Sequence, residues 1–335
     1  MTVANVVFID TNIFRGAGFN FSAARIDALR EVAKRDRLTL LMPETTEDEI
    51  HRHILRLSKE NVASLRALES KAFLLKRLLG WPLKTKSEEQ VVSKLVETLN
   101  SDCDEFFKLF NVVKLGNENI NLGEVLEWWK AFSAPFSEKK SNEFIDAFTV
   151  SILLNHQAKT KTKIAVISDD DDWLQVCERL SGFDYYRNPS AYAESLNPNI
   201  KAIMGIKSEL YKSAAILEEI RSKFLTSKFI FTIGWDSELS NIEIQDLSIG
   251  EFHVVSTDSE TCKANFSAKI GFTFDATYKD IVADDIVLEY PHDIFSKYHN
   301  VISISGSVSM KVDIKAAKIT EIINVELDEN EYQVP

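Results

Sequence analysis

Short apolar runs that alternate with helix-like segments are the feature of the sequence that most constrains its fold. The first half contains three such runs: "NVVFID" at 5–10, "RLTLLMP" at 37–43 and "KIAVIS" at 163–168. Helix-like patterns separate them, the longest extending with interruptions from about residue 46 to residue 129. Strands that alternate with helices predict a parallel sheet with helices on both faces. We therefore expect an α/β fold for this half of the chain.

After residue 227 the apolar pattern changes to a period of two, which is typical of antiparallel strands. The alternating apolar residues of "CKANFSAKIGFTFDATY" are Ala264, Phe266, Ala268, Ile270, Phe272, Phe274 and Ala276. We expect this apolar face to pack on the preceding helix-like segment at 206–224. The sequence thus predicts two domains: an α/β domain at 1–190 and, at 191–335, a helix followed by an antiparallel β domain.

The formal net charge of −12 argues against a nucleic-acid partner, because phosphates attract Lys and Arg. The charge is unevenly distributed, however. Residues 1–190 carry 26 basic against 28 acidic side chains, whereas residues 191–335 carry 13 against 23. The second domain would therefore repel phosphates. We expect it to regulate or assemble the protein, because long alternating strands leave edges that suit pairing with another copy or with a protein partner.

Hydropathy and cysteine content indicate the compartment. No segment approaches the roughly 20 apolar residues of a membrane span, and the apolar start is too short for a signal peptide. The three cysteines, Cys103, Cys177 and Cys262, are odd in number and form no CxxC pair, so we expect buried, reduced thiols. These features predict a cytoplasmic protein with no membrane partner.

Acidic side chains follow two of the apolar runs directly. Asp10 ends the first run, and four aspartates at 169–172 follow the third. The carboxyl ends of parallel strands meet at one edge of a sheet, so Asp10 faces one of the later aspartates if the two strands are neighbours. Carboxylates that close require a cation, and oxygen-only ligands favour Mg²⁺ or Mn²⁺.

Two further acidic places are expected at the same edge of the sheet. A helix that begins within "MPETTEDEI" carries Glu49, with Glu47 as an alternative, and "NEFIDAF" places Glu143 and Asp146 on one helical face. Asp146 lies among apolar residues, and no Lys or Arg occurs three or four positions away. A charge in such surroundings is costly unless it is coordinated or lies at the wall of a cleft.

In this order the acidic positions resemble the motifs of the PIN-domain nuclease family. The first motif is a strand-ending aspartate followed by Thr and Asn, and the second is a glutamate a few residues after a proline, here Pro43. The third is an aspartate within an apolar helix, and the fourth reads Ser-x-Asp-x-Asp-aromatic. The matching residues are Asp10, Thr11, Asn12, Glu49, Glu143, Asp146, Ser168, Asp170, Asp172 and Trp173.

The resemblance covers residues 6–173 and is closest to the larger PIN-like proteins, which have a helical insertion between the second and third motifs. It does not extend to the β domain. It implies an endonuclease that cleaves single-stranded or structured RNA, such as tRNA, to 5′-phosphate and 3′-hydroxyl ends. A toxin, a phage-defence effector and an RNA-processing enzyme would share these motifs.

The resemblance also implies a role for each residue of the motifs. The implied ligands of Mg²⁺ or Mn²⁺ are Asp10, Asp146, Asp170, Asp172 and Glu143. The implied catalytic set is Asp10, Glu49, Asp146 and Asp170, in which Glu49 binds or orients a second ion or its water. The residues implied to orient the carboxylates or water are Thr11, Asn12 and Ser168.

Some of these residues, and the basic residues near them, also suit purely structural roles. Asp170 is a suitable N-cap for a helix over "DDWLQVCERL", and four acids exceed what one cap needs, so capping and metal binding can coexist. On the helix that carries Glu49, basic residues recur at i+3, i+4 and i+7, where they would bind substrate phosphate or form a solvated stripe. These residues are Arg52, His53 and Arg56, and the same two interpretations apply to Lys139 and Lys140.

Two other classes of function are compatible with the sequence. A non-catalytic nucleic-acid or protein-binding module on a PIN fold would keep the architecture without the chemistry. A haloacid-dehalogenase-like phosphatase also begins with a strand that ends in Asp, but it requires a carboxylate two residues later, where Asn12 stands. Metal-dependent cleavage of RNA by the purified protein would separate these classes.

Overall fold

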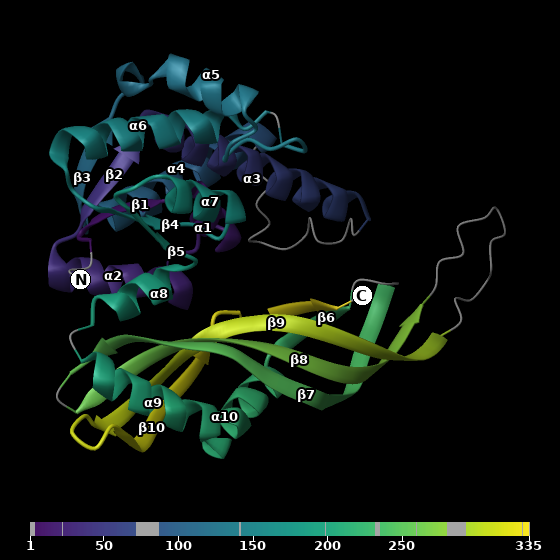
Figure 1. Cartoon of the computed structure of the whole chain (residues 1–335). Coiled ribbons are helices and arrows are strands. Elements are labelled where there is room, and N and C mark those ends of the chain that lie inside the picture. Colours follow the sequence, from purple (N-terminus) through teal and green to yellow (C-terminus); the bar gives the residue numbers. More distant parts are fainter. Residues whose placement is uncertain are drawn as a thin grey trace. The chain divides into compact units, whose positions relative to one another are not determined.

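The structure of the chain is a computed structural model (Figure 1). It describes residues 4–21, 23–71, 87–140, 142–197, 199–231, 235–258, 260–279, 293–329 and 331–334. The chain divides into two compact units. One unit comprises Met1–Ser22 and Leu29–Tyr192, and the other comprises Ala23–Ala28 and Ala193–Pro335.

A five-stranded parallel sheet forms the centre of the first unit, which confirms the predicted α/β fold. The strand order is β3-β2-β1-β4-β5. The strands are β1 (Val6–Ile9), β2 (Thr39–Pro43), β3 (Asn111–Leu115), β4 (Ile164–Ile167) and β5 (Phe183–Tyr186). Every residue of β4 is buried, as expected for a central strand that is covered on both faces.

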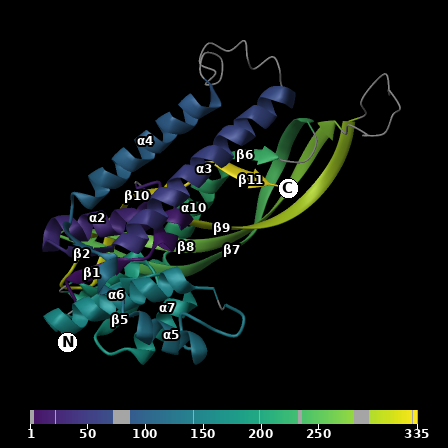
Figure 2. The same ribbon diagram turned by 90° about the horizontal axis from the view of Figure 1, so that it is seen from above.

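Helices connect these strands and cover the sheet. The helices from Thr11 to Ser195 are α1 (Thr11–Gly16), α2 (Ala24–Asp36), α3 (Glu44–Lys71), α4 (Glu88–Phe107), α5 (Leu122–Lys130), α6 (Phe144–Thr160), α7 (Asp171–Arg179) and α8 (Pro189–Ser195). Helices α5, α6 and α7 share a hydrophobic core with Phe8, Leu41 and Val166 of the central strands. Helices α3 and α4 lie alongside one another (Figure 2).

The long helical region expected between residues 46 and 129 contains a strand that the pattern did not predict. Residues 111–115 form β3 and pair with β2, Leu40 lying opposite Val112. None of the five residues of β3 is fully buried, so this edge strand lacks the apolar signal that marks the central strands. Strand β5, at the opposite edge of the sheet, was not predicted either.

A four-stranded antiparallel sheet dominates the second unit, in the order β10-β9-β8-β7. Its strands are β7 (Trp235–Thr257), β8 (Thr261–Lys279), β9 (Asp293–Asp313) and β10 (Lys318–Leu327). A separate parallel pair joins β6 (Lys228–Phe231) to β11 (Glu331–Val334). All seven alternating apolar residues of β8 are buried, so the period-two prediction is confirmed.

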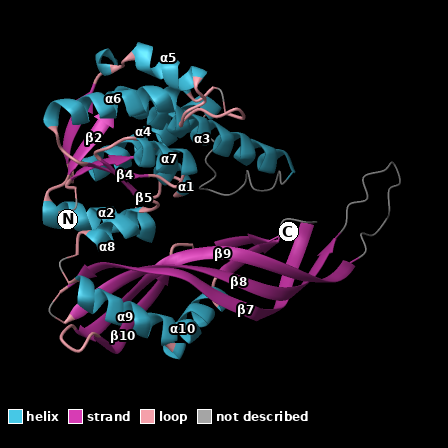
Figure 3. Ribbon diagram, viewed as in Figure 1, coloured by secondary structure: helices cyan, strands magenta, loops and turns pink. Residues whose placement is uncertain are grey.

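The apolar face of this sheet packs on α9 (Ile200–Lys212) and α10 (Ala214–Leu225) (Figure 3). The prediction of a single helix over 206–224 is wrong, because Ser213 interrupts it. The Ser213 hydroxyl accepts a hydrogen bond from the backbone of Ile216 and caps the start of α10. None of the helices in the described part of the chain is long and apolar enough to cross a membrane.

Candidate active site

The pairing of two central strands brings the first acidic residue to the end of another strand. Strands β1 and β4 are adjacent and parallel, with Ile9 opposite Ile167. The next residue along each strand, Asp10 and Ser168, therefore lies at the same edge of the sheet. The Asp10 backbone amide donates to the Ile167 carbonyl at 2.9 Å, and Ser168 Oγ donates to Asp10 Oδ2 at 2.6 Å. Ser168 thus fixes the orientation of the Asp10 carboxylate.

Burial and neighbouring charges perturb the Asp10 carboxyl. Asp10 is only 6 % exposed, and burial raises its pKa to about 6. The hydrogen bond from Ser168 opposes this rise, whereas the charges of Glu49, Asp169 and Asp170 add to it. Acids from α3 and from the segment before α7 therefore lie close enough to Asp10 to repel it.

Asp146, in the first turn of α6, is more strongly perturbed. Burial is the main cause that raises its pKa to about 8, and the charges of Asp10, Glu49, Glu143 and Asp170 raise it further. Among the described residues the Asp146 carboxylate has no hydrogen bond or ion pair. The sheet, α3 and α6 thus bring acids from three distant parts of the sequence to one place, without a basic partner for Asp146.

Glu49 is held by side chains on two sides. Thr11 Oγ1, at the start of α1, donates to Glu49 Oε2 at 3.1 Å, and His53 Nε2 lies 3.3 Å from Glu49 Oε1. Arg56 Nη2 lies 2.9 Å from His53 Nδ1. Arginine can only donate, so His53 accepts at Nδ1 and donates from Nε2 to Glu49. Two residues of the expected substrate-binding stripe, His53 and Arg56, therefore also orient Glu49.

Asp170 caps α7 as well as lying near the other acids. Its carboxylate accepts a hydrogen bond from the backbone amide of Asp172 at 2.9 Å, which is the expected N-cap contact. Its own backbone amide donates to Ser168 Oγ at 3.1 Å. A lysine also reaches this end of α7, because Lys140 Nζ lies 2.5 Å from Asp172 Oδ2 and 3.7 Å from Asp170 Oδ1. In the sequence, only a run of charges pointed to Lys140.

Asp10, Glu49, Asp146 and Asp170, with Glu143 and Asp172 beside them, form an acidic cluster. A cavity of about 350 Å³ opens beside this cluster. Its lining combines acidic residues with the basic stripe of α3: Glu49, Arg52, His53, Arg56, Asn142, Glu143, Ile145 and Asp146. Glu143 was expected within a helix, but it occupies the N-cap position of α6, where its side chain makes no capping bond. Asn12, in the first turn of α1, is half-buried and forms no side-chain hydrogen bond with the described residues.

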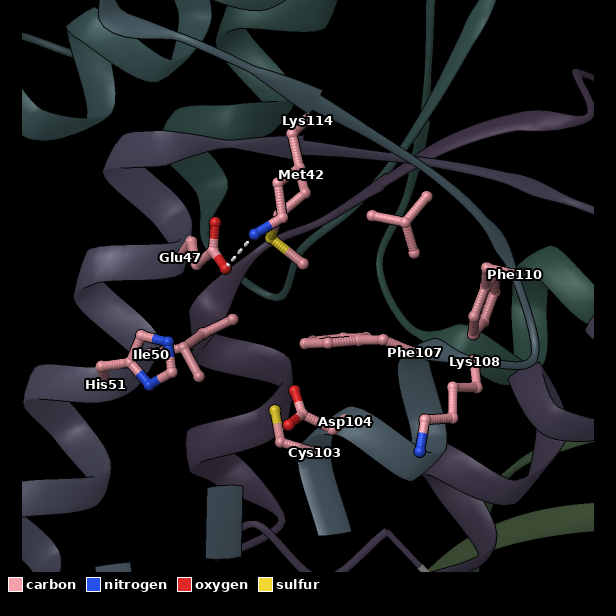
Figure 4. Close-up of a pocket in the computed structure, with 11 residues that line it drawn as sticks. Met42, Glu47, Ile50, His51, Cys103, Asp104, Phe107, Lys108, Phe110 and Lys114 are labelled. Carbon is pink, nitrogen blue, oxygen red and sulfur yellow. Dashed lines mark hydrogen bonds and ion pairs between the residues drawn. The ribbon is translucent and has the colours of Figure 1, made fainter. Parts of the chain in front are cut away.

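A second cavity of about 330 Å³ lies against the opposite face of α3 (Figure 4). Its walls are largely apolar, with Met42, Phe107 and Phe110 among them. Burial raises the pKa of the Cys103 thiol in this cavity to about 12, so it is protonated and unreactive at neutral pH. Glu47 is paired with Lys114 here at 2.7 Å, which leaves Glu49 as the acid that α3 contributes to the site.

Within the described residues, no group of three or more His, Cys, Asp or Glu side chains is placed to hold a metal ion as it stands. Several carboxylate oxygens instead accept bonds from Ser168, Thr11, His53 or Lys140. The chemistry of the donor set nevertheless fits Mg²⁺ or Mn²⁺, because all of its candidate ligands are carboxylates. A cation would also offset the repulsion that raises the pKa values of Asp10 and Asp146.

One comparison with known proteins gives a match. Residues 7–173 match the family model of the PIN domain. No curated protein and no solved structure matches the chain. The matched segment begins in β1 and ends in the first turn of α7, so it contains each of the acids described above.

The raised pKa values predict how stability depends on pH without divalent metal. Between the ordinary value of 3.8 and the folded values of about 6 for Asp10 and about 8 for Asp146, the folded protein holds protons that the unfolded chain has released. The contribution of these two groups to the free energy of unfolding therefore falls as the pH rises through that window. Asp146→Asn should raise the free energy of unfolding near pH 8 by about 1–3 kcal/mol, after a discount for partial exposure.

Denaturant titrations in EDTA, near pH 5 and near pH 8, measure this effect as the difference in the free energy of unfolding between wild type and Asp146→Asn. The difference should be small at the lower pH and larger at the higher pH. The control is Asp171→Asn, because Asp171 is exposed and pairs with Arg187 outside the cluster. A difference that is independent of pH would contradict the electrostatic description of Asp146.

Proposed function

Because the chain belongs to the PIN-domain family, we propose that it is a divalent-metal-dependent endoribonuclease. The observation that carries this proposal is the pair Asp10 and Asp146: two acids from different elements whose pKa values are raised by burial and by the charges of Glu49 and Asp170, without a basic partner among the described residues. A protein retains repelling, desolvated carboxylates at a cavity mainly where function uses them. The adjoining basic stripe of α3 provides groups that can bind phosphate.

Each residue of the cluster has a part in the proposed reaction. Asp10, Asp146 and Asp170 would hold the cation with Glu143 beside them, and Glu49 and Asp172 would bind or orient a second ion or its water. Bound Mg²⁺ or Mn²⁺ supplies a lowered water pKa and offsets the charge that develops during an in-line displacement. Ser168 fixes Asp10, and Thr11 with His53 fixes Glu49, so these acids would be oriented before substrate arrives.

The proposed substrate is RNA, single-stranded or structured, with tRNA as one candidate. In the proposed hydrolysis a water oxygen bonds to phosphorus while the bond to the 3′ oxygen breaks, which leaves 5′-phosphate and 3′-hydroxyl ends. Arg52 and Arg56 lie on the cavity wall next to Glu49, where their guanidinium groups can contact phosphates on either side of the cleaved bond. Residues 1–190 carry nearly equal numbers of basic and acidic side chains, 26 against 28, which permits such binding.

A second candidate function is a PIN-fold module that binds RNA or a protein without cleaving. It is favoured by one observation: no three acidic or ligating side chains among the described residues are already arranged around a metal position. Metal binding and cleavage distinguish the two candidates directly.

The first prediction from this function concerns metal binding. Mg²⁺ or Mn²⁺ should raise the melting temperature of the wild type, because a ligand of the folded state stabilises it by RT ln(1 + [L]/Kd). Asp10→Asn, Asp146→Asn and Asp170→Asn should each abolish RNA cleavage and reduce that shift. Thermal melts with EDTA and with metal, together with cleavage of mixed RNA, measure both effects.

Asp170→Asn tests capping against metal binding. Asparagine caps helices as well as aspartate does, so α7 should keep its N-cap in this variant. If Asp170 serves only as a cap, cleavage and the metal shift will both survive. Asp171→Asn is the matched control, since it removes a neighbouring charge that is exposed and paired with Arg187. Wild-type cleavage in all three cluster variants would end the nuclease proposal.

A further prediction concerns the basic stripe of α3. Neutralising Arg52 and Arg56 to Gln should weaken RNA binding and reduce the slope of log K against log salt by about 0.7 for each lost phosphate contact. The control is the pair Lys59→Gln and Lys94→Gln, which removes two charges that do not line this cavity. Fluorescence anisotropy with labelled RNA over a salt series gives the slopes. Equal slopes for the two double variants would place the stripe outside the RNA path.

The last prediction for this function concerns the second unit, which we propose regulates or assembles the enzyme and does not hold RNA. With 13 basic against 23 acidic side chains in residues 191–335, it repels phosphate. Ultraviolet crosslinking of RNA to the whole chain, followed by peptide mapping, should yield adducts in residues 1–190. Adducts concentrated on β7–β10 would contradict this assignment. Instead of binding RNA, we propose that this unit pairs with another copy or with a protein partner along its strand edges.

A further inference from the structure

The acids of the cluster are unequally neutralised. Lys140 Nζ lies 2.5 Å from Asp172 Oδ2 and 3.7 Å from Asp170 Oδ1. The Asp10 carboxylate accepts a hydrogen bond from the neutral hydroxyl of Ser168, and the Asp146 carboxylate has no basic or hydrogen-bonding partner within the described residues. A single ammonium group thus already occupies one side of the cluster, at the two acids of the segment that begins α7.

The loop that carries Lys140 is anchored, so the position of this lysine is built into the fold. Ser137 and Lys140 exchange two backbone hydrogen bonds of 3.1 Å, which closes a tight turn. Phe136, in the same loop, is buried and packs on Phe144 at a ring distance of 5.0 Å. The turn therefore sits firmly against the start of α6, and Lys140 extends from it.

The same loop is also fastened to α7. Arg179, the last residue of α7, donates to the Ala134 carbonyl at 2.7 Å and lies 4.8 Å from the centre of the Trp128 ring. Lys140 contacts the opposite end of that helix, in its first turn. Two separate contacts thus hold the loop along α7 and direct Lys140 to Asp170 and Asp172.

The ammonium group is nevertheless displaceable. The Lys140 side chain is 44 % exposed, and an ion pair of this exposure contributes little to stability. A lysine carries one charge, whereas Mg²⁺ and Mn²⁺ carry two and can bind several carboxylates at once. A divalent cation can therefore replace Lys140 at Asp170 and Asp172, but it must compete with it.

We propose that Lys140 is the internal counter-ion of this site, which neutralises Asp170 and Asp172 in the metal-free protein and is displaced when a divalent cation binds. This inference rests on the proposed metal-dependent function. Lys140 is then a positioning residue. Its ammonium group keeps Asp170 and Asp172 in place until the cation arrives, and it weakens the affinity of the site for that cation.

The test compares Lys140→Met with wild type by calorimetric titration with Mn²⁺ in the absence of RNA, and by thermal melts in EDTA. Without its internal competitor the site should bind Mn²⁺ roughly fivefold more tightly, the factor that corresponds to a partly exposed ion pair. In EDTA the variant should melt at a lower temperature than wild type, since two neighbouring carboxylates have lost their counter-ion. Saturating Mn²⁺ should remove that difference.

Three further variants make the result specific. Lys140→Arg keeps the charge and should retain the wild-type affinity for Mn²⁺, whereas Lys140→Gln should behave as Lys140→Met does. Lys139→Met removes the neighbouring charge and should match wild type in both measurements. If Lys140 only fastens the loop, its removal should lower the melting temperature equally with and without metal.

The outcomes separate this inference from the proposed function. If wild type binds Mn²⁺ and cleaves RNA, but Lys140→Met binds Mn²⁺ with unchanged or weaker affinity, the counter-ion role is wrong and the nuclease proposal stands. If neither protein binds Mn²⁺ or cleaves RNA, the proposed function fails and this inference fails with it. Tighter binding in Lys140→Met and Lys140→Gln, with Lys140→Arg like wild type, supports the role.

Discussion

The parallel pairing of β1 with β4 is the constraint on which the rest of the site depends. It places Asp10 beside Ser168, whose hydroxyl donates to the Asp10 carboxylate and accepts from the backbone amide of Asp170. One buried hydroxyl therefore joins the ends of two strands and the start of α7. A register shift of one residue would turn the Asp10 side chain to the other face of the sheet. The position of the first acid thus follows from backbone hydrogen bonds.

This arrangement concentrates negative charge where the fold least tolerates it. Burial is the main reason that the pKa values of Asp10 and Asp146 are raised, and the charges of Glu49 and Asp170 raise both further. The surrounding structure compensates unequally: His53 and Thr11 contact Glu49, and Lys140 contacts Asp172. Asp146 has no such partner in the described part of the chain. Residual strain of this kind is typical of sites where stability is sacrificed for function.

Helix α3 separates two different environments. One of its faces bears Glu49, Arg52 and His53 toward the acidic cavity, and the opposite face bears Glu47 and Ile50 toward the apolar cavity. Helical periodicity makes this division, because residues three or four positions apart share a face. The pairing of Glu47 with Lys114 on the apolar side explains why only one of two neighbouring acids can join the cluster.

The sequence by itself determined the alternating α/β pattern, the period-two strand β8 and the acids at the ends of β1 and β4, because each of these signals is local. It could not identify the edge strands β3 and β5, whose partly exposed residues carry little apolar periodicity, or the break at Ser213. Tertiary structure alone decided that Lys140 lies against Asp172, and that Glu47 faces away from the cluster while Glu49 faces it. These contacts join residues far apart in the chain, and only the packing of the loop, the strands and α3 brings them together.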